Sequence, residues 1–322
     1  MKKLLLALVA AAATALFAAN ARAAGDFPSR PITFVCVFGP GSASDTIARI
    51  IGDQLGSVLN TSVIVENRQG ADGAIAATYV ARAAPDGHTL LLATNSPLSA
   101  APFLLKHVSY DPVKDFTPVT RVGSFTLMIV VNPSLPIHSL ADMITYAKAN
   151  PGKVSFATGN TAGIVALATI NHWAGTDIAH VPYKTTPPAL QDVMAGRVSM
   201  MLADFTTASP HVKSGALRAI AVSRIQRSTL FPELPTIDEA GLAGFNLDTW
   251  AGFVAPAKTP PAVVTQLNGA LRKVIDNPDV KAKFRNVGFE GFSSTPEELG
   301  DYIKVQLGLW GKMIKDAGVY QE

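Results

Sequence analysis

The chain has 322 residues, of which 48% are hydrophobic and 16% are charged, and it contains one cysteine. A chain of this length exceeds what a single hydrophobic core usually serves, so two domains are expected. Its 27 basic and 24 acidic residues form no basic tail, stripe or run, which argues against binding to nucleic acid or to an anionic membrane surface.

The first 23 residues have the three-part pattern of a secretory signal peptide. Lys2 and Lys3 precede an apolar run at 4–19, and residues 21–23 form a small-residue cleavage pattern. The run is shorter than the roughly 20 apolar residues that a membrane-spanning helix needs. We therefore expect export to the periplasm and cleavage near Ala23. Removal of this leader takes away three basic residues and no acidic one, so the processed chain has a formal net charge of zero.

Beyond the leader, apolar runs typical of strands alternate with segments of helical periodicity. Ile47, Ile51 and Leu55, for example, recur every four positions and form one apolar face. In chain order, strands are predicted at 32–38, 62–66, 89–94, 126–132, 153–157, 199–203 and 219–223. Helices are predicted at 45–59, 74–83, 140–149, 162–173, 187–195, 261–276 and 296–317. This alternation predicts an α/β sheet architecture.

Many of the predicted strands are continuously apolar, as is typical of parallel strands that helices cover on both faces. No low-complexity linker separates two domains. We therefore expect two lobes joined by extended strands that cross between them, at 119–126 and at 248–256. One lobe would comprise 24–123 with 250–322, and the other would comprise 124–249.

Three junctions between a predicted strand and a predicted helix combine small residues with hydroxyl and amide groups, at 38–45, 94–97 and 157–163. Helix N-termini leave N–H donors unpaired and carry a partial positive charge. A carboxylate or phosphate is their natural partner, and glycines allow it to approach the backbone closely. The hydroxyls could instead serve only as helix caps. Three such loops at the carboxyl ends of strands favour a ligand cleft.

Patterns typical of metal sites and enzymes are missing from the sequence. The six histidines form no H-x-H or H-E-x-x-H spacing, and there is no G-x-S-x-G, Walker or G-x-G-x-x-G motif. We expect no catalytic residue, no metal and no cofactor. A hydrolase that uses Ser42 or Ser44 with a distant His and Asp is the alternative, because such triads are defined by geometry. Cys36 has no disulfide partner and is predicted to be a small buried side chain on a strand.

A series of short motifs runs through the chain: FGPGSASD at 38–45, VENR at 65–68, APDGHTLL at 84–91, YDPVKDF at 110–116, VVNP at 130–133, HVPYK at 180–184, AGRV at 195–198, LPT at 234–236, GFVAP at 252–256 and PEE at 296–298. In this order they resemble the Bug proteins, the substrate-binding proteins of tripartite tricarboxylate transporters. The resemblance implies a two-lobe type II periplasmic binding fold with a ligand cleft between the lobes. It also implies a small carboxylate ligand, a cognate inner-membrane permease or a sensor kinase as partner, a monomer, and no enzymatic activity.

Family members hold their ligands mainly through loop amides, hydroxyls and bridging waters. The resemblance assigns ligand binding here to Phe38, Gly39, Pro40, Gly41, Ser42, Ala43, Ser44, Thr94, Asn95, Ser96, Thr158, Gly159, Asn160, Thr161, Ala162, Tyr183, Thr185, Asp204 and Phe205. Phe38, Phe205 and Trp250 would contact the body of the ligand. Lys184 is either a countercharge for the ligand or a solvated surface lysine.

Several positions depart from the family pattern. Ser42 and Thr185 stand where the family usually has glycine, which puts the carry-over of the Tyr183–Thr185 turn in doubt. Residues 164–166, Ile-Val-Ala, replace polar residues that are common in relatives, and Ala251 replaces an aromatic residue. These changes suggest a less polar and roomier cleft that favours an aromatic or otherwise apolar carboxylate over citrate-like acids; a dicarboxylic acid is the other candidate. Alternatively, residues 164–166 face the core of their own lobe.

Overall fold

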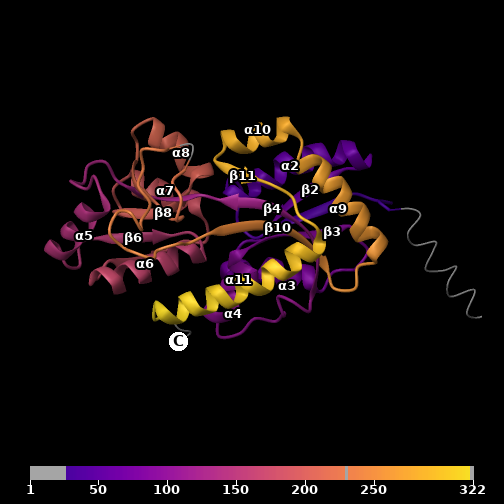
Figure 1. The fold of residues 1–322 in the computed structure, drawn as a ribbon, viewed down its shortest axis with the longest axis horizontal. Coiled ribbons are helices and arrows are strands. Elements are labelled where there is room, and N and C mark those ends of the chain that lie inside the picture. Colours follow the sequence, from indigo (N-terminus) through magenta and orange to yellow (C-terminus); the bar gives the residue numbers. More distant parts are fainter. Residues whose placement is uncertain (1–26, 229–230, 320–322) are drawn as a thin grey trace, which may run out of the picture.

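The computed structural model describes residues 27–228 and 231–319. The predicted signal peptide lies outside these residues. Within them, no helix is both long and apolar enough to cross a membrane. The chain forms two α/β halves that lie side by side, each built around its own sheet (Figure 1).

The first half contains a six-stranded sheet in the order β11-β4-β10-β3-β1-β2. Its strands are β1 (Ile32–Cys36), β2 (Val63–Asn67), β3 (Thr89–Thr94), β4 (Phe116–Phe125), β10 (Thr249–Pro256) and β11 (Phe289–Gly291). The helices around it are α2 (Ala43–Leu59), α3 (Ala74–Ala81), the turn η2 (Ser96–Ala100), α4 (Ala101–Leu104), α9 (Pro261–Ile275), α10 (Pro278–Asn286) and α11 (Pro296–Asp316). A short turn, η1 (Ala71–Gly73), precedes α3.

Helices cover both faces of this sheet, and β1 shows how. Phe34 and Cys36 belong to a cluster with the apolar faces of α2 and α9, whereas Val35 and Val37 belong to a cluster with α3 and α11. Successive side chains of a strand point to opposite faces, so the fully buried positions of such a strand are apolar on both faces. The prediction that Cys36 is buried on a strand is confirmed.

The second half contains a five-stranded sheet in the order β7-β6-β8-β5-β9. Its strands are β5 (Leu127–Val131), β6 (Ser155–Thr158), β7 (Ala179–Pro182), β8 (Met200–Asp204) and β9 (Arg218–Val222). One face buries residues of α5 (Leu140–Ala149) and α6 (Thr161–Ala174), and the other buries residues of α7 (Thr186–Met194) and α8 (Phe205–Lys213).

Two extended segments connect the halves. β4 continues through Thr126 into β5 of the second sheet, and β10 returns the chain to the first sheet beside β4 (Figure 1). β4 and β10 pair antiparallel, with Thr249 opposite Phe125 at the end nearest the second half. The crossings predicted at 119–126 and 248–256 correspond to these segments.

Both sheets are mixed rather than parallel. β10 pairs antiparallel with β3 and β4, and β5 pairs antiparallel with β8 and β9. The expectation of parallel strands was therefore wrong for the runs at 126–132 and 219–223. A strand buried on both faces is continuously apolar whatever the direction of its neighbours, so this pattern does not reveal strand direction.

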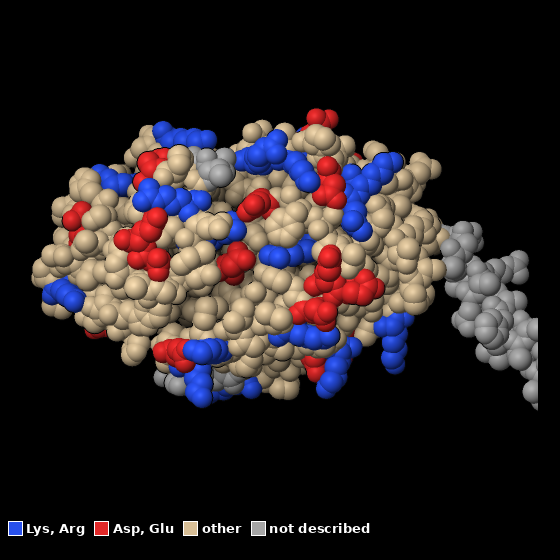
Figure 2. All heavy atoms as spheres, in the orientation of Figure 1, with Lys and Arg blue, Asp and Glu red and all other residues tan. Residues whose placement is uncertain are grey.

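Acidic and basic side chains are interspersed on the face shown in Figure 2, without an extended patch of either sign. This agrees with the near balance of charge in the sequence. The described surface in this view therefore lacks the continuous basic stripe that is typical of nucleic-acid-binding proteins.

Candidate functional site

A cavity lies between the two sheets, where β1, β3, β6 and β8 end. Its walls come from both halves and are formed by Phe38, Ser42, Ala43, Ser44, Thr94, Asn95, Ser96, Phe125, Leu127, Asn160, Ala162, Thr186, Asp204 and Thr249. The cavity volume is about 30 Å³, so little free space is left between the halves. The two halves are thus closed on one another.

Specific contacts join the halves around the cavity. The hydroxyls of Ser96 and Thr161 lie 2.7 Å apart, and the amide of Asn95 lies 3.5 Å from the Thr161 hydroxyl. At Gly288, a Cβ atom would lie 2.5 Å from Cβ of Phe205. Gly288 also has a φ of +71°, which non-glycine residues rarely adopt. Glycine is therefore required here both for its backbone conformation and for the close approach of the two halves.

The first wall of the cavity is the N-terminus of α2. Ser42 is its N-cap, and the Ser42 hydroxyl accepts a hydrogen bond from the backbone N–H of Asp45 at 3.3 Å. Ala43 and Ser44 occupy the first turn, where N–H groups have no carbonyl partner within the helix. Both residues line the cavity. The sequence therefore places backbone donors and two serine hydroxyls at this wall.

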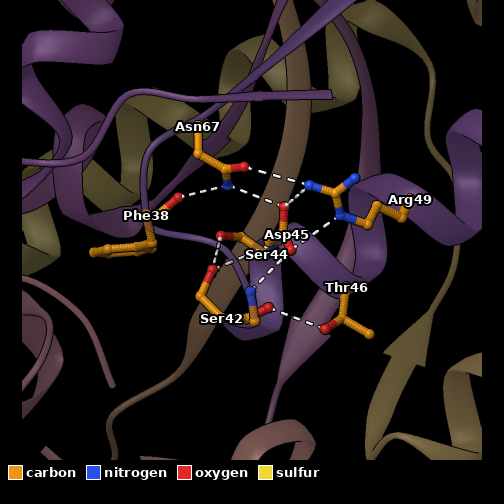
Figure 3. Close-up of polar contacts among 8 residues, drawn as sticks. Phe38, Ser42, Ser44, Asp45, Thr46, Arg49 and Asn67 are labelled. Atoms are coloured by element: carbon orange, nitrogen blue, oxygen red, sulfur yellow. Dashed lines mark hydrogen bonds and ion pairs between the residues drawn. The ribbon is translucent and has the colours of Figure 1, made fainter. Parts of the chain in front are cut away.

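The carboxylate of Asp45 holds the loop before α2 in place (Figure 3). It accepts hydrogen bonds from the backbone N–H of Gly41 at 2.9 Å, from the Arg49 guanidinium at 2.8 and 3.1 Å, and from the Asn67 amide at 3.0 Å. The Asn67 amide also donates to the carbonyl of Phe38 at 2.8 Å. Burial alone would raise the pKa of Asp45, but these donors outweigh it and hold the pKa below its usual range. The loop from Phe38 to Asp45 is thus fixed before any ligand arrives.

Three further helices of the second half start at or beside the cavity. Asn160 caps α6, and its side-chain oxygen accepts from the N–H of Gly163 at 2.9 Å. α7 starts after Thr185, whose buried hydroxyl has no hydrogen-bond partner among the described residues, and α8 starts after Asp204. The positive ends of these helices, together with that of α2, are therefore gathered around one small space.

The cavity wall contains no Lys, Arg or His among the described residues, and Asp204 is its one ionisable group. The Thr186 hydroxyl donates to the Asp204 carboxyl at 3.2 Å. Burial raises the pKa of Asp204 to about 6. Within the described ranges, no group of three or more His, Cys, Asp or Glu is arranged to hold a metal ion.

Many residues that the sequence singled out lie in the cavity wall. These are Phe38, Ser42, Ala43, Ser44, Thr94, Asn95, Ser96, Asn160, Ala162 and Asp204. The others are adjacent to the wall or directed elsewhere, namely Gly39, Pro40, Gly41, Thr158, Gly159, Thr161, Tyr183, Thr185 and Phe205. Sequence reasoning missed four wall residues: Phe125, Leu127, Thr186 and Thr249. Phe125 and Thr249 lie within the predicted crossings and Leu127 directly follows one, and that position was the signal that could have found them.

Several predicted contacts are directed away from the cavity. The Tyr183 hydroxyl donates to Asp192 at 2.5 Å, and Phe205 packs edge-on against Phe231 in the core of the second half. Trp250 lies in the core of the first half against Tyr302. Phe205 and Trp250 are therefore not wall residues, because the interiors of their own lobes bury their rings. Lys184 is exposed and is not in the wall.

The residues at 164–166 do not line the cavity. Val165 and Ala166 are buried in the core of the second half, as the alternative interpretation expected. The apolar part of the wall comes from Phe38, Phe125 and Leu127.

The wall offers hydrogen-bond donors and apolar surface but lacks the partners of a catalytic serine. The Ser42 hydroxyl lies 3.3 Å from the Ser44 hydroxyl, and no histidine is among the described wall residues. A serine nucleophile needs an adjacent base to be activated. The arrangement suits recognition of an anion by helix N-termini and hydroxyls.

Comparison with known proteins gives a consistent result. The model of the family described as "Tripartite tricarboxylate transporter family receptor" matches residues 47–319. Protein BugT of Bordetella pertussis is 33% identical over 298 residues, which cover 92% of this chain and 91% of BugT.

Solved structures of similar proteins share the fold. Rpa4515 of R. palustris with adipate has a TM-score of 0.89 at 31% identity, and the periplasmic binding protein BugD has a TM-score of 0.88 at 32% identity; each match covers 92% of this chain and all of the other. MatC of Rhodopseudomonas palustris with bound malate has a TM-score of 0.84 at 30% identity, over 89% of this chain and all of MatC. The two-lobe α/β arrangement is therefore that of periplasmic binding proteins.

Proposed function

Because this chain belongs to the tripartite tricarboxylate transporter family of receptors, which bind solutes and are not enzymes, we propose that it captures a small carboxylate in the periplasm for a cognate inner-membrane permease. Delivery to a sensor kinase is the alternative for the partner. The protein acts as a monomer after loss of its signal peptide. Its lobes comprise 24–123 with 250–322, and 124–249.

One observation carries this proposal: helix N-termini from both halves surround a cavity whose described wall contains hydroxyls and amides but no cationic side chain. A helix N-terminus stabilises a nearby anion by about 0.3–1 kcal/mol, and by up to about 2 kcal/mol when partly buried. Several of them together are sufficient to bind a carboxylate without an arginine or lysine. The hydroxyls of Ser42, Ser44 and Ser96 supply further donors.

The apolar part of the wall indicates the body of the ligand. Phe38, Phe125 and Leu127 contribute roughly 25 cal/mol per Å² of ligand surface that they bury. A carboxylate with a hydrophobic body, either aromatic or an aliphatic dicarboxylate, matches this wall better than citrate, whose additional carboxylate would lack a partner. One ligand-bound relative carries adipate, an aliphatic dicarboxylate of this class, and another carries malate, a shorter dicarboxylate whose hydroxyl makes its body polar.

Capture occurs by closure of the two halves about the β4–β5 and β10 crossings. Such a hinge motion buries a ligand from water. The described arrangement is closed, since Ser96 and Thr161 are in hydrogen-bond contact. The cavity therefore opens by separation of the lobes to admit a ligand.

The direct test is a thermal-shift screen of the exported, processed protein after unfolding and refolding to remove bound ligand. The panel comprises adipate, malate, citrate, benzoate, phthalate and aspartate. A ligand at 100 times its dissociation constant stabilises the fold by about 2.7 kcal/mol, which a melting curve resolves. A shift with adipate or benzoate and none with citrate is the expected result. Absence of a shift with every member would overturn the carboxylate proposal.

A further inference from the structure

The described wall of the candidate cavity contains one buried acid, Asp204. The proposed function places the carboxylate of the ligand in the same cavity. Asp204 ends β8 directly before α8, and its carboxyl lies in the cavity wall. Among the described side chains, its hydrogen-bond partner is the Thr186 hydroxyl at 3.2 Å. It makes no side-chain cap hydrogen bond to α8. The carboxyl is thus held in the cavity without serving the helix that follows it.

No cation in the described chain compensates this acid. On the elements packed around it, Leu127 of β5 is its opposite neighbour, and the wall residues of α2, α6, α7, η2 and β10 are not ionisable. The ionisable groups on these elements are engaged or remote: Asp45 pairs with Arg49 on α2, Asp192 of α7 pairs with Arg197, and Asp53, His211 and Lys213 lie outside the wall.

Three titratable groups of β7 and the turn after it lie near this end of the second sheet. The His180 ring nitrogen contacts the Thr158 hydroxyl at 2.6 Å, the Tyr183 hydroxyl donates to Asp192, and Lys184 is exposed and outside the cavity wall. The raised pKa of Asp204 has burial as its largest cause, opposed by hydrogen bonds from Thr186 and from the backbone, and no ionised side chain is among the causes. Asp204 therefore titrates as an isolated buried acid.

Two ionised carboxylates in one buried cavity without a cation repel each other strongly. The conflict disappears if one of them carries a proton, because a carboxylic acid then donates a short, charge-assisted hydrogen bond to the carboxylate beside it. Burial has already raised the pKa of Asp204 to about 6, and a ligand anion raises it further. Asp204 is thus the group that takes the proton.

We propose that protonated Asp204 donates a hydrogen bond to the carboxylate of the ligand, so that capture takes up one proton from solution wherever Asp204 is ionised in the free protein. This inference rests on the proposed function, since it requires a carboxylate ligand. It makes Asp204 a specificity residue that favours ligands with an acceptor at this point. It also makes affinity depend on pH: above the pKa of Asp204 in the free protein, the dissociation constant rises about tenfold per pH unit.

The test is calorimetric titration of the processed protein with adipate, malate and benzoate between pH 5 and pH 9. Each titration is repeated in two buffers with different enthalpies of ionisation, since the difference between them reports the number of protons bound. Above pH 7, we expect uptake of about one proton per ligand and tenfold weaker binding per pH unit. Binding with no proton uptake and a flat pH profile would overturn the inference while leaving the carboxylate receptor intact.

The variant Asp204→Asn provides an independent arm. Its amide keeps an oxygen that accepts from Thr186 and adds an N–H that replaces the proposed O–H donor. We expect binding at pH 8 at least as tight as in the unmodified protein, with no proton uptake. Asp177→Asn, the same change at an exposed site of the second half, should retain the pH dependence.

Two other results would be decisive. A folded Asp204→Asn protein that loses binding more than tenfold at pH 6 would show that the ionised carboxylate is an acceptor for a ligand hydroxyl or ammonium, contrary to the inference. Failure of all three acids to bind the unmodified protein at any pH, together with no thermal shift from the other members of the panel, would overturn the proposed function as well.

Discussion

The Thr249 hydroxyl donates a hydrogen bond to the backbone carbonyl of Phe125 at 3.2 Å. The two residues are opposite each other on β10 and β4, where both strands approach the second half, and both line the cavity. The crossing between the halves and the cavity wall therefore share residues. A change in the angle between the halves must alter the shape of the cavity.

Loss of the Asp45 carboxylate is expected to weaken ligand binding without unfolding the protein. Asp45→Ala removes the acceptor for Gly41, Arg49 and Asn67, so the loop that begins at Phe38 is no longer fixed. We expect at least a tenfold loss of affinity, since ordering this loop would then oppose binding. Asp53→Ala, an exposed acid on the same helix, is the control for calorimetry. Equal affinities in the two variants would contradict the positioning role.

The pH dependence of stability at Asp204 has a definite sign. Its pKa is raised by burial from 3.8 to about 6 in the folded protein, so the folded state holds this proton more tightly than the unfolded state does. The free energy of unfolding should therefore fall as the pH rises from about 4 to about 6, and then level off. Each pKa unit corresponds to about 1.4 kcal/mol.

Asp204→Asn removes this ionisation and should raise the melting temperature at pH 7.5 more than at pH 4. Asp177→Asn is the matched control on an exposed site of the same half. If the difference in melting temperature between Asp204→Asn and the unmodified protein were the same at pH 4 and pH 7.5, Asp204 would not be a destabilising buried charge.

The sequence predicted where the first helix begins because its information is local. The spacing of Ile47, Ile51 and Leu55 identified the helix, and the preceding small and hydroxyl residues identified its start; the structure places Ser42 at that N-cap. Strand direction was not predictable, because the runs in β1 and β5 are equally apolar although β1 pairs parallel and β5 antiparallel. Burial of both faces hides the difference.

The sequence also did not predict whether an aromatic ring faces the cavity or the core of its own half. Phe38 lies between β1 and α2, and Phe205 begins α8 directly after β8. Phe38 nevertheless lines the cavity, whereas Phe205 packs on Phe231 in its own core. Whether a ring next to a ligand loop faces the ligand or the core depends on the packing of helices distant in the sequence. Thr186 was missed for a similar reason, since its role depends on its contact with Asp204.

The hydrogen bond between Ser96 and Thr161 joins the two halves, so it forms only when they are closed. It should therefore increase ligand affinity by stabilising the closed state. Thr161→Val keeps the shape of the side chain and removes the hydroxyl that lies 2.7 Å from Ser96 and 3.5 Å from Asn95. A buried polar group that loses its partner costs about 1–3 kcal/mol, so affinity should fall by roughly tenfold or more. Thr169→Val on the same helix, outside this cavity, is the control. Unchanged calorimetric affinity in Thr161→Val would show that this hydrogen bond does not form in the ligand-bound protein.

Gly288→Ala should impair lobe closure itself. Its Cβ atom would lie 2.5 Å from Cβ of Phe205 in the opposite half, so the closed arrangement has no room for it. Gly175→Ala is a close control, because Gly175 has a φ of +62° and nothing within 4 Å of the added atom. Both variants should lose about 1 kcal/mol of stability from the left-handed backbone. Gly288→Ala should in addition bind ligand at least tenfold more weakly, and small-angle scattering should show that it stays more open when ligand is added. Equal affinities in the two variants would mean that, in the ligand-bound protein, Gly288 and Phe205 lie farther apart than in this structure.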